Sequence, residues 1–322
     1  MRNFAHVNAT SLDQAIEMLR RYGKKAAIIA GGTDLLGKMK DEILHTYPEA
    51  LINIKSIPGL DIVASQSDGL IIGTLTRLAD IAANGTIIER YPALAEAARR
   101  TASTHLREMG TIGGNISQDI RCWYYRNPNN RFPCLRKGGG RCYAIEGDNR
   151  YHSIFGGSVE KGCYAVHPSD IAPALVALDA TIKTTKRSLR IEDFFQILPV
   201  TTTVLDSDEI VTEIKLPPPN GRSAFMKFAL RKAIDFPIVN CAAAIATSGD
   251  RVTSARICLN AVYVKPYRAF KAEEVIMGKT IREADAEAAG AACVADAQPM
   301  THNAYMVPVA KTMIKRAILG CA

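Results

Sequence analysis

Eight cysteines occur in this chain of 322 residues, and four of them fall within one stretch. Cys122, Cys134, Cys142 and Cys163 are separated by 11, 7 and 20 residues. Four thiolates can hold an iron–sulfur cluster, which tolerates wide ligand spacing. Zinc ribbons instead use pairs of cysteines two residues apart, and the chain has no such pair, which makes zinc less favoured. The spacing alone leaves three alternatives: a cluster, a zinc ion or metal-free thiols.

Basic residues surround these cysteines: Arg121, Arg126, Arg131, Arg136, Lys137, Arg141 and Arg150. Positive charge favours thiolates and offsets a negatively charged cluster, and glycines 138–140 would let backbone N–H groups approach sulfur. A solvated basic loop is the alternative. With four thiols available, we interpret His152 and His167 as ordinary loop histidines. The scattered cysteines, Cys241, Cys258, Cys293 and Cys321, are interpreted as small buried hydrophobic residues.

Two glycine-rich turns could hold an anionic group. Gly31 and Gly32 follow the apolar run 26–30, and Gly113 and Gly114 lie in a similar turn at 111–115. Glycine lets the backbone turn sharply and lets a bulky anion approach the N–H groups without meeting a Cβ. A helix beginning near residue 33 would add a favourable dipole. Either turn alone is most simply a tight turn, but the two together predict one diphosphate site.

The elements that must position these residues follow from periodicity and turn residues. Strands are predicted at 4–8, 26–30, 51–54, 62–64, 70–73, 181–185, 209–216, 225–230, 239–246 and 255–262. Helices are predicted at 11–22, 33–40, 78–83, 87–99, 170–178, 281–294 and 304–319. Ser11 and Gln14 form a capping box. The cluster Pro217–Gly221 is the clearest linker, so a last domain begins near residue 220.

Composition narrows the class of protein. With 48% hydrophobic and 22% charged residues, the chain resembles an ordinary soluble protein. A net charge of +8 permits anionic ligands or an acidic partner, but no nucleic-acid-binding pattern is present. The start of the chain does not resemble a signal peptide, and no apolar run approaches the ~18 residues of a membrane span. We therefore expect a cytoplasmic protein with free thiols or metal ligands rather than disulfides.

Three segments, Ala30–Asp34, Thr111–Asn115 and Ser169–Leu175, resemble those of one family. They are similar to the FAD-binding medium subunit of the molybdenum hydroxylases, the group with carbon monoxide, xanthine and nicotinate dehydrogenases. The similarity continues through 209–216 and 227–232, so it covers nearly all of the chain. It implies an α+β protein: a two-subdomain FAD-binding fold (PCMH, or molybdopterin dehydrogenase, type) with a cysteine-rich insert, and a C-terminal α+β domain of antiparallel sheet and helices. The expected boundaries are 1–55 for subdomain 1, 56–219 for subdomain 2 with the insert at about 121–168, and 220–322 for the C-terminal flavoprotein domain.

The resemblance also implies site residues. The FAD diphosphate would lie on Ile29, Ala30, Gly31, Gly32, Thr33, Asp34 and Leu35 and on Thr111, Gly113, Gly114 and Asn115. Asp170 would reach the cofactor, Val211 and Lys227 would line the isoalloxazine pocket, and Ala102 is a further candidate. No catalytic residue is expected on this chain.

The insert resembles that of the β subunit of 4-hydroxybenzoyl-CoA reductase, where such a segment holds a [4Fe-4S] cluster. Most other family members join the glycine turn to the Ser169–Asp170 segment by a short loop. The resemblance implies that Cys122, Cys134, Cys142 and Cys163 are the cluster ligands. Residues 146–158 look like an extra loop beyond that pattern.

The family implies an electron-transfer subunit. FAD exchanges electrons singly or in pairs, and a cluster moves them singly. The expected partners are a molybdopterin-binding large subunit and a [2Fe-2S] small subunit in a dimer of heterotrimers, with ferredoxin or a similar carrier. The expected reaction is removal of the ring hydroxyl of 4-hydroxybenzoyl-CoA. The alternatives are the flavin subunit of an aldehyde, purine or nicotinate dehydrogenase, and a structural zinc-binding module.

Overall fold

The computed structural model describes residues 1–158, 162–197 and 201–322. Three positions of the predicted insert, 159–161, and three of the predicted second subdomain, 198–200, lie outside the described residues. Within the described ranges, no helix is long and apolar enough to cross a membrane.

The N-terminal part is a small parallel sheet in the order β1-β3-β2. Its strands are β1 (Ala5–Asn8), β2 (Ala26–Ile29) and β3 (Ala50–Asn53), and the helices are α1 (Leu12–Tyr22) and α2 (Leu35–Lys40). The predicted capping box starts α1, because Ser11 Oγ accepts a hydrogen bond from the Gln14 N–H at 3.2 Å. Gln14 Oε1 in turn accepts from the Thr10 N–H at 2.8 Å. This sheet carries the first glycine turn at the carboxyl end of β2.

The middle part is a five-stranded antiparallel sheet in the order β4-β5-β8-β6-β7. The strands are β4 (Val63–Gln66), β5 (Gly69–Gly73), β6 (Thr181–Thr184), β7 (Ser188–Arg190) and β8 (Val211–Leu216). The helices are α3 (Leu78–Ala83), α4 (Gly85–Arg90), α5 (Pro92–Arg99), α6 (Thr104–Met109), α7 (Ile112–Ile116), α8 (Ile171–Ala177) and α9 (Ile191–Phe194). Pro92 begins α5 as predicted, whereas the short helices α6 and α9 were not predicted.

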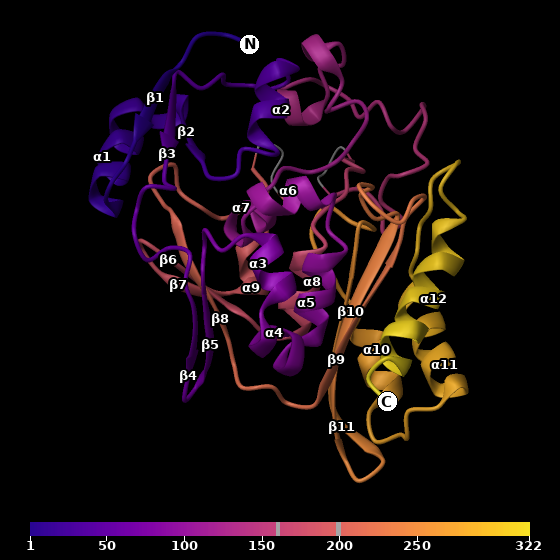
Figure 1. Ribbon diagram of the computed structural model, residues 1–322. Helices are drawn as coiled ribbons and strands as arrows, with labels where there is room; N and C mark the ends of the chain where they lie inside the picture. Colours follow the sequence, from indigo (N-terminus) through magenta and orange to yellow (C-terminus); the bar gives the residue numbers. More distant parts are fainter. Residues whose placement is uncertain (159–161, 198–200) are drawn as a thin grey trace.

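The C-terminal part is an antiparallel sheet in the order β12-β11-β10-β9. The strands are β9 (Arg222–Phe228), β10 (Val239–Ser248), β11 (Arg251–Asn260) and β12 (Tyr267–Arg268). One face packs on α5 and α8, and the other is covered by α10 (Phe270–Ile276), α11 (Glu283–Val294) and α12 (Met306–Leu319), which form the yellow and orange layer of Figure 1. The middle helices therefore lie between two sheets, and side chains from both sheets share one core.

Buried thiols contribute to these cores. Cys241, Cys293 and Cys321 pack in the core beneath the C-terminal helices, and Cys258 packs on the opposite face of the sheet. All four are free and buried, which confirms the sequence interpretation.

The insert has little regular structure beyond two 3-10 turns, η2 (Pro128–Asn130) and η3 (Leu135–Lys137). Its later part is nevertheless anchored to the C-terminal domain. The Ile154 N–H donates to Val262 O at 3.0 Å, and the Gln298 N–H donates to Ile154 O at 2.7 Å. Asn149 and Ile154 are both fully buried. Residues 146–158 form a loop, as expected from the sequence, and this loop packs in the interface between the insert and the C-terminal domain.

Candidate cofactor sites

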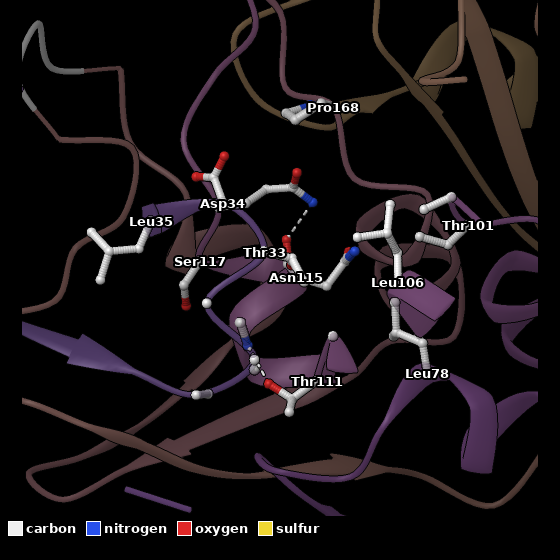
Figure 2. A pocket seen from close by; sticks show the side chains of 18 of the residues that line it. Thr33, Asp34, Leu35, Leu78, Thr101, Leu106, Thr111, Asn115, Ser117 and Pro168 are labelled. Atoms are coloured by element: carbon white, nitrogen blue, oxygen red, sulfur yellow. Dashed lines mark hydrogen bonds between the residues drawn. The ribbon is translucent and has the colours of Figure 1, made fainter. Parts of the chain in front are cut away.

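A cavity of about 310 Å³ opens where the first sheet meets α7 and the end of β8. It is lined by all but one of the residues predicted to bind FAD: Ile29, Ala30, Gly31, Gly32, Thr33, Asp34, Leu35, Ala102, Thr111, Gly113, Gly114, Asn115, Asp170 and Val211. Figure 2 shows Leu35 on one side of this space and Leu78 and Leu106 on the other. We call it the flavin pocket.

The two glycine turns touch each other in this pocket. A Cβ built on Gly31 would lie only 2.0 Å from the Met109 carbonyl oxygen, which directly precedes the second turn. Gly32 has a φ of +70°, a conformation that glycine adopts without strain. The predicted pairing of the two turns is therefore present, and glycine at position 31 permits the close contact.

The second turn is fixed by hydrogen bonds to its neighbours. Thr111 Oγ1 accepts a hydrogen bond from the Gly114 N–H at 3.2 Å and so caps α7, as the dashed line in Figure 2 shows. Asn115 Oδ1 accepts from the Ser169 hydroxyl, which itself accepts from the Ala172 N–H at 2.9 Å. These bonds join the glycine turn to the segment that carries Asp170.

Asp34 faces the insert. Its Oδ1 atom lies 2.8 Å from Arg126 and 3.1 Å from Arg121, and its Oδ2 atom accepts a hydrogen bond from the Asp119 N–H at 3.0 Å. Burial by itself would raise the pKa of Asp34, but Arg126, Arg121 and Lys38 lower it below its ordinary value. Asp34 therefore stays ionised and joins the first glycine turn to the cysteine segment.

Lys227 is the one predicted FAD residue that does not line the cavity. Its Nζ atom lies 2.7 Å from Asp170 Oδ2, so it sits directly behind that carboxylate.

A second cavity brings the four insert cysteines together. Cys122, Cys134, Cys142 and Cys163 line it with the aromatic residues Tyr124, Tyr125 and Tyr143. Arg136 Nε donates to Cys163 Sγ at 3.2 Å, and His152 Nε2 lies 3.2 Å from Cys122 Sγ. His152 and His167 lie in irregular segments, as interpreted from the sequence, but each is 1% exposed and therefore buried. We call this space the cysteine cavity.

Among the described residues, no group of three His, Cys, Asp or Glu side chains lies close enough together to hold a single metal ion. A tetrahedral zinc ion needs its ligands within about 2.3 Å of the metal, whereas a cluster presents its irons in several directions.

Comparisons with known proteins match the chain in two consecutive segments. Residues 2–219 match the FAD binding domain in molybdopterin dehydrogenase, and residues 224–321 match the CO dehydrogenase flavoprotein C-terminal domain. The chain belongs to the molybdopterin dehydrogenase family of FAD-binding subunits.

Relatives span the whole chain. The aldehyde oxidoreductase FAD-binding subunit PaoB of Escherichia coli K12 is 34% identical, over 94% of this chain and 92% of the relative. The carbon monoxide dehydrogenase medium chain of Hydrogenophaga pseudoflava is 27% identical, over 96% and 93%.

Solved structures share the fold. Carbon monoxide dehydrogenase from Hydrogenophaga pseudoflava, in a form that lacks the Mo-pyranopterin moiety, aligns with a TM-score of 0.77 and 24% identity over 99% of this chain and 97% of that one. Quinoline 2-oxidoreductase from Pseudomonas putida 86 aligns with a TM-score of 0.76 and 22% identity over the same shares.

The flavin pocket of this FAD-binding subunit fits the cofactor chemically. Gly114 lines this pocket, and a Cβ built there would lie 3.0 Å from Thr111 Oγ1, which is a tight contact. A side chain at this position would project into the pocket, and glycine leaves room for a bulky anion beside the backbone.

One buried cation close to the cysteine cavity favours an anionic group there. Lys137 is 7% exposed, and its Nζ atom has no hydrogen-bond partner among the described residues. Burial raises the pKa of Cys122 to about 12, and it also raises the pKa of Cys134 and of Cys142. A buried ammonium beside neutral thiols is unfavourable, whereas thiolates that ligate a cluster would balance its charge.

Sequence reasoning missed several pocket residues: Lys38, Leu106, Ser117, Gln118, Arg121, Pro168, Ile234 and Phe236. Arg121 was noted only as a basic neighbour of the first cysteine. Phe236 reaches the pocket from the loop between β9 and β10. The spacing of residues in the sequence does not indicate that this loop lies near Arg121.

Proposed function

We propose that this chain is the FAD- and [4Fe-4S]-containing electron-transfer subunit of a molybdenum hydroxylase-type complex. The proposal depends on one observation: four cysteines distant in sequence line one cavity, close to the buried Lys137, whose Nζ atom has no hydrogen-bond partner among the described residues. FAD exchanges electrons singly or in pairs, so it can connect one-electron carriers to a two-electron centre.

The proposed route begins at the cluster. Ferredoxin or a similar carrier exchanges electrons with it, and FAD connects it to the partner subunits. Those partners are a molybdopterin-binding large subunit and a [2Fe-2S] small subunit. With this chain they would form a heterotrimer, and two heterotrimers would form a dimer. The name of a relative supports a multi-subunit assembly, since the one from Hydrogenophaga pseudoflava is a medium chain.

Two substrate classes have specific support. The cysteine insert supports reductive dehydroxylation of 4-hydroxybenzoyl-CoA, through its resemblance to that reductase. Sequence similarity supports aldehyde oxidation, because the relative that is 34% identical is an aldehyde oxidoreductase subunit. No residue of this chain is proposed to contact the substrate of either reaction.

The cofactor assignment is tested on the anaerobically isolated complex by iron, sulfide and zinc analysis with absorption and EPR spectra. We expect a flavin spectrum and about four irons with four acid-labile sulfides assignable to this chain. One zinc with no iron at this site would instead make the cysteine cavity a structural zinc site.

The ligand set is tested by Cys134→Ser, with Cys293→Ser as a matched control outside the insert. We expect Cys134→Ser to lose the cluster and to retain FAD, because the bonds that tie the flavin pocket to the insert use Asp34, Arg121 and Arg126 and no cysteine. A Cys134→Ser protein with its full iron content would refute the ligand assignment.

The substrate is tested on the purified complex with two assays. One supplies aldehydes and an electron acceptor, and the other supplies reduced ferredoxin and 4-hydroxybenzoyl-CoA. Turnover in the first assay alone would support aldehyde oxidation, and turnover in the second alone would support dehydroxylation of 4-hydroxybenzoyl-CoA.

A further inference from the structure

Arg121 belongs to the cysteine insert, yet its side chain lines the flavin pocket. The next residue, Cys122, lines the cysteine cavity. We infer that Arg121 is a cofactor-binding residue that the insert contributes, and that its guanidinium binds the diphosphate of FAD. This inference rests on the proposed function, since it requires FAD in the pocket.

The guanidinium is held in place by three parts of the chain. It lies 3.1 Å from Asp34 Oδ1 on the first glycine turn, and it donates to Asp119 O at 2.7 Å. It also donates to Gln118 Oε1 at 3.3 Å, and it lies 4.2 Å from the ring centre of Phe236. A cation fixed in this way loses little conformational entropy when it binds an anion. The contact with Asp34 places Arg121 at the end of the pocket that carries the glycine turn.

The local charge balance favours an anion. Lys38, Arg121 and Arg126 contribute three positive charges, and Asp34 and Asp119 contribute two negative ones. All five side chains are at most 22% exposed, so solvent screens them only partly. A diphosphate would neutralise the excess, and the planar guanidinium can donate two hydrogen bonds to phosphate oxygens.

The carboxylates that line the pocket already have basic partners. Asp170 pairs with Lys227, and Asp235 pairs with Arg231. Asp34 has both oxygens engaged, Oδ1 by Arg121 and Arg126 of the insert and Oδ2 by the Asp119 N–H just before the insert. Asp34 is therefore a positioning residue that acts through Arg121, and the arginines prevent its charge from repelling the diphosphate.

The test uses the full complex after removal of FAD by dialysis against concentrated salt. Binding of FAD and of riboflavin, which has no phosphate, is followed by quenching of flavin fluorescence. We expect Arg121→Gln to weaken FAD binding by roughly 10- to 100-fold, the range for lost charge-assisted hydrogen bonds, with riboflavin affinity unchanged. Arg131→Gln is the matched control, because Arg131 is an exposed arginine of the same insert that does not line the pocket.

Arg121→Lys keeps the charge and removes the paired donors, so we expect an intermediate loss of FAD affinity. This variant decides the question if Arg121→Gln fails to fold, with folding judged by retained iron and by the circular dichroism spectrum. Wild-type FAD affinity in a folded variant, or equal losses for FAD and riboflavin, would overturn the inference. A wild-type complex without FAD would overturn the proposed function itself, so the two failures are distinguishable.

Discussion

Lys227 Nζ lies 2.7 Å from Asp170 Oδ2, and the two side chains are only 5% and 3% exposed. Asn240 Nδ2 donates to the other carboxylate oxygen at 2.7 Å, and Lys227 also donates to Arg100 O at 2.9 Å. Burial raises the pKa of Asp170, and Lys227 opposes that rise. Lys227 and Asn240 therefore each engage one carboxylate oxygen of Asp170 in the wall of the flavin pocket.

Lys227→Met should leave the Asp170 carboxylate buried without a positive partner. Removing one member of a buried ion pair typically costs about 3–5 kcal/mol, so we expect that loss in the free energy of unfolding. The combined Asp170→Asn, Lys227→Met variant should lose less than Lys227→Met alone, because no buried charge remains. Denaturant unfolding of the single and combined variants measures the coupling, and purely additive losses would contradict it.

Gly31→Ala should disrupt the flavin pocket because its Cβ would lie 2.0 Å from the Met109 carbonyl oxygen, a backbone atom. We expect the first and second glycine turns to separate and bound FAD to fall below a tenth of the wild-type content. Gly37→Ala is the matched control, since Gly37 lies in α2 and a Cβ there meets nothing within 4 Å. Helix propensity predicts a gain of about 0.5–1 kcal/mol for that control. Flavin content per chain measures both, and full content in Gly31→Ala would contradict the prediction.

Local sequence signals were sufficient to predict the structure where the conformation depends on a single turn or the start of a single helix. The capping box that starts α1, the glycine turns and Pro92 at the start of α5 each depend on residues a few positions apart. Such signals can be read from a sequence because the interactions are local. The family resemblance supplied three further pocket residues, Ala102, Asp170 and Val211.

Contacts between segments that are distant in the sequence could not be predicted from hydrophobic periodicity or residue spacing. Arg121 enters the flavin pocket because Asp34 holds it, and Phe236 packs on it from a loop more than a hundred residues away. His152 lies in a loop, but its burial was not predictable, because a distant segment packs there: the Asn303 side chain donates to the His152 carbonyl oxygen at 2.9 Å. These positions depend on how the insert docks between the two domains, and no local periodicity encodes that docking.

Lys137→Met should lower the midpoint potential of the proposed cluster. Lys137 is a buried cation whose charge lies near Cys134 and Cys122, and reduction adds a negative charge to the cluster. Loss of a nearby cation makes reduction less favourable, by roughly 50–100 mV for an interaction of about 1–2 kcal/mol. A redox titration followed by EPR measures the shift. Lys24→Met, the same change at an exposed lysine of the first subdomain, should leave the potential unchanged.

His167 should make stability depend on pH. Its ring is 1% exposed and packs against Phe195 with 4.9 Å between ring centres, and Nδ1 lies 3.2 Å from Asn260 Nδ2. Burial lowers the pKa of His167 from 6.5 to about 3. Between these values the unfolded chain binds a proton that the folded chain does not, so the folded state loses stability as pH falls through this window.

His167→Gln should therefore remove part of the pH dependence. One proton accounts for a slope of at most about 1.4 kcal/mol per pH unit, so the free energy of unfolding should fall less steeply below pH 6.5 in this variant. His105→Gln changes an exposed histidine and should keep the wild-type slope. Urea unfolding between about pH 5 and 7.5 measures the slopes. If His167→Gln and wild type gave the same slope, His167 would be shown to take up its proton without unfolding, which would contradict its burial as a neutral ring.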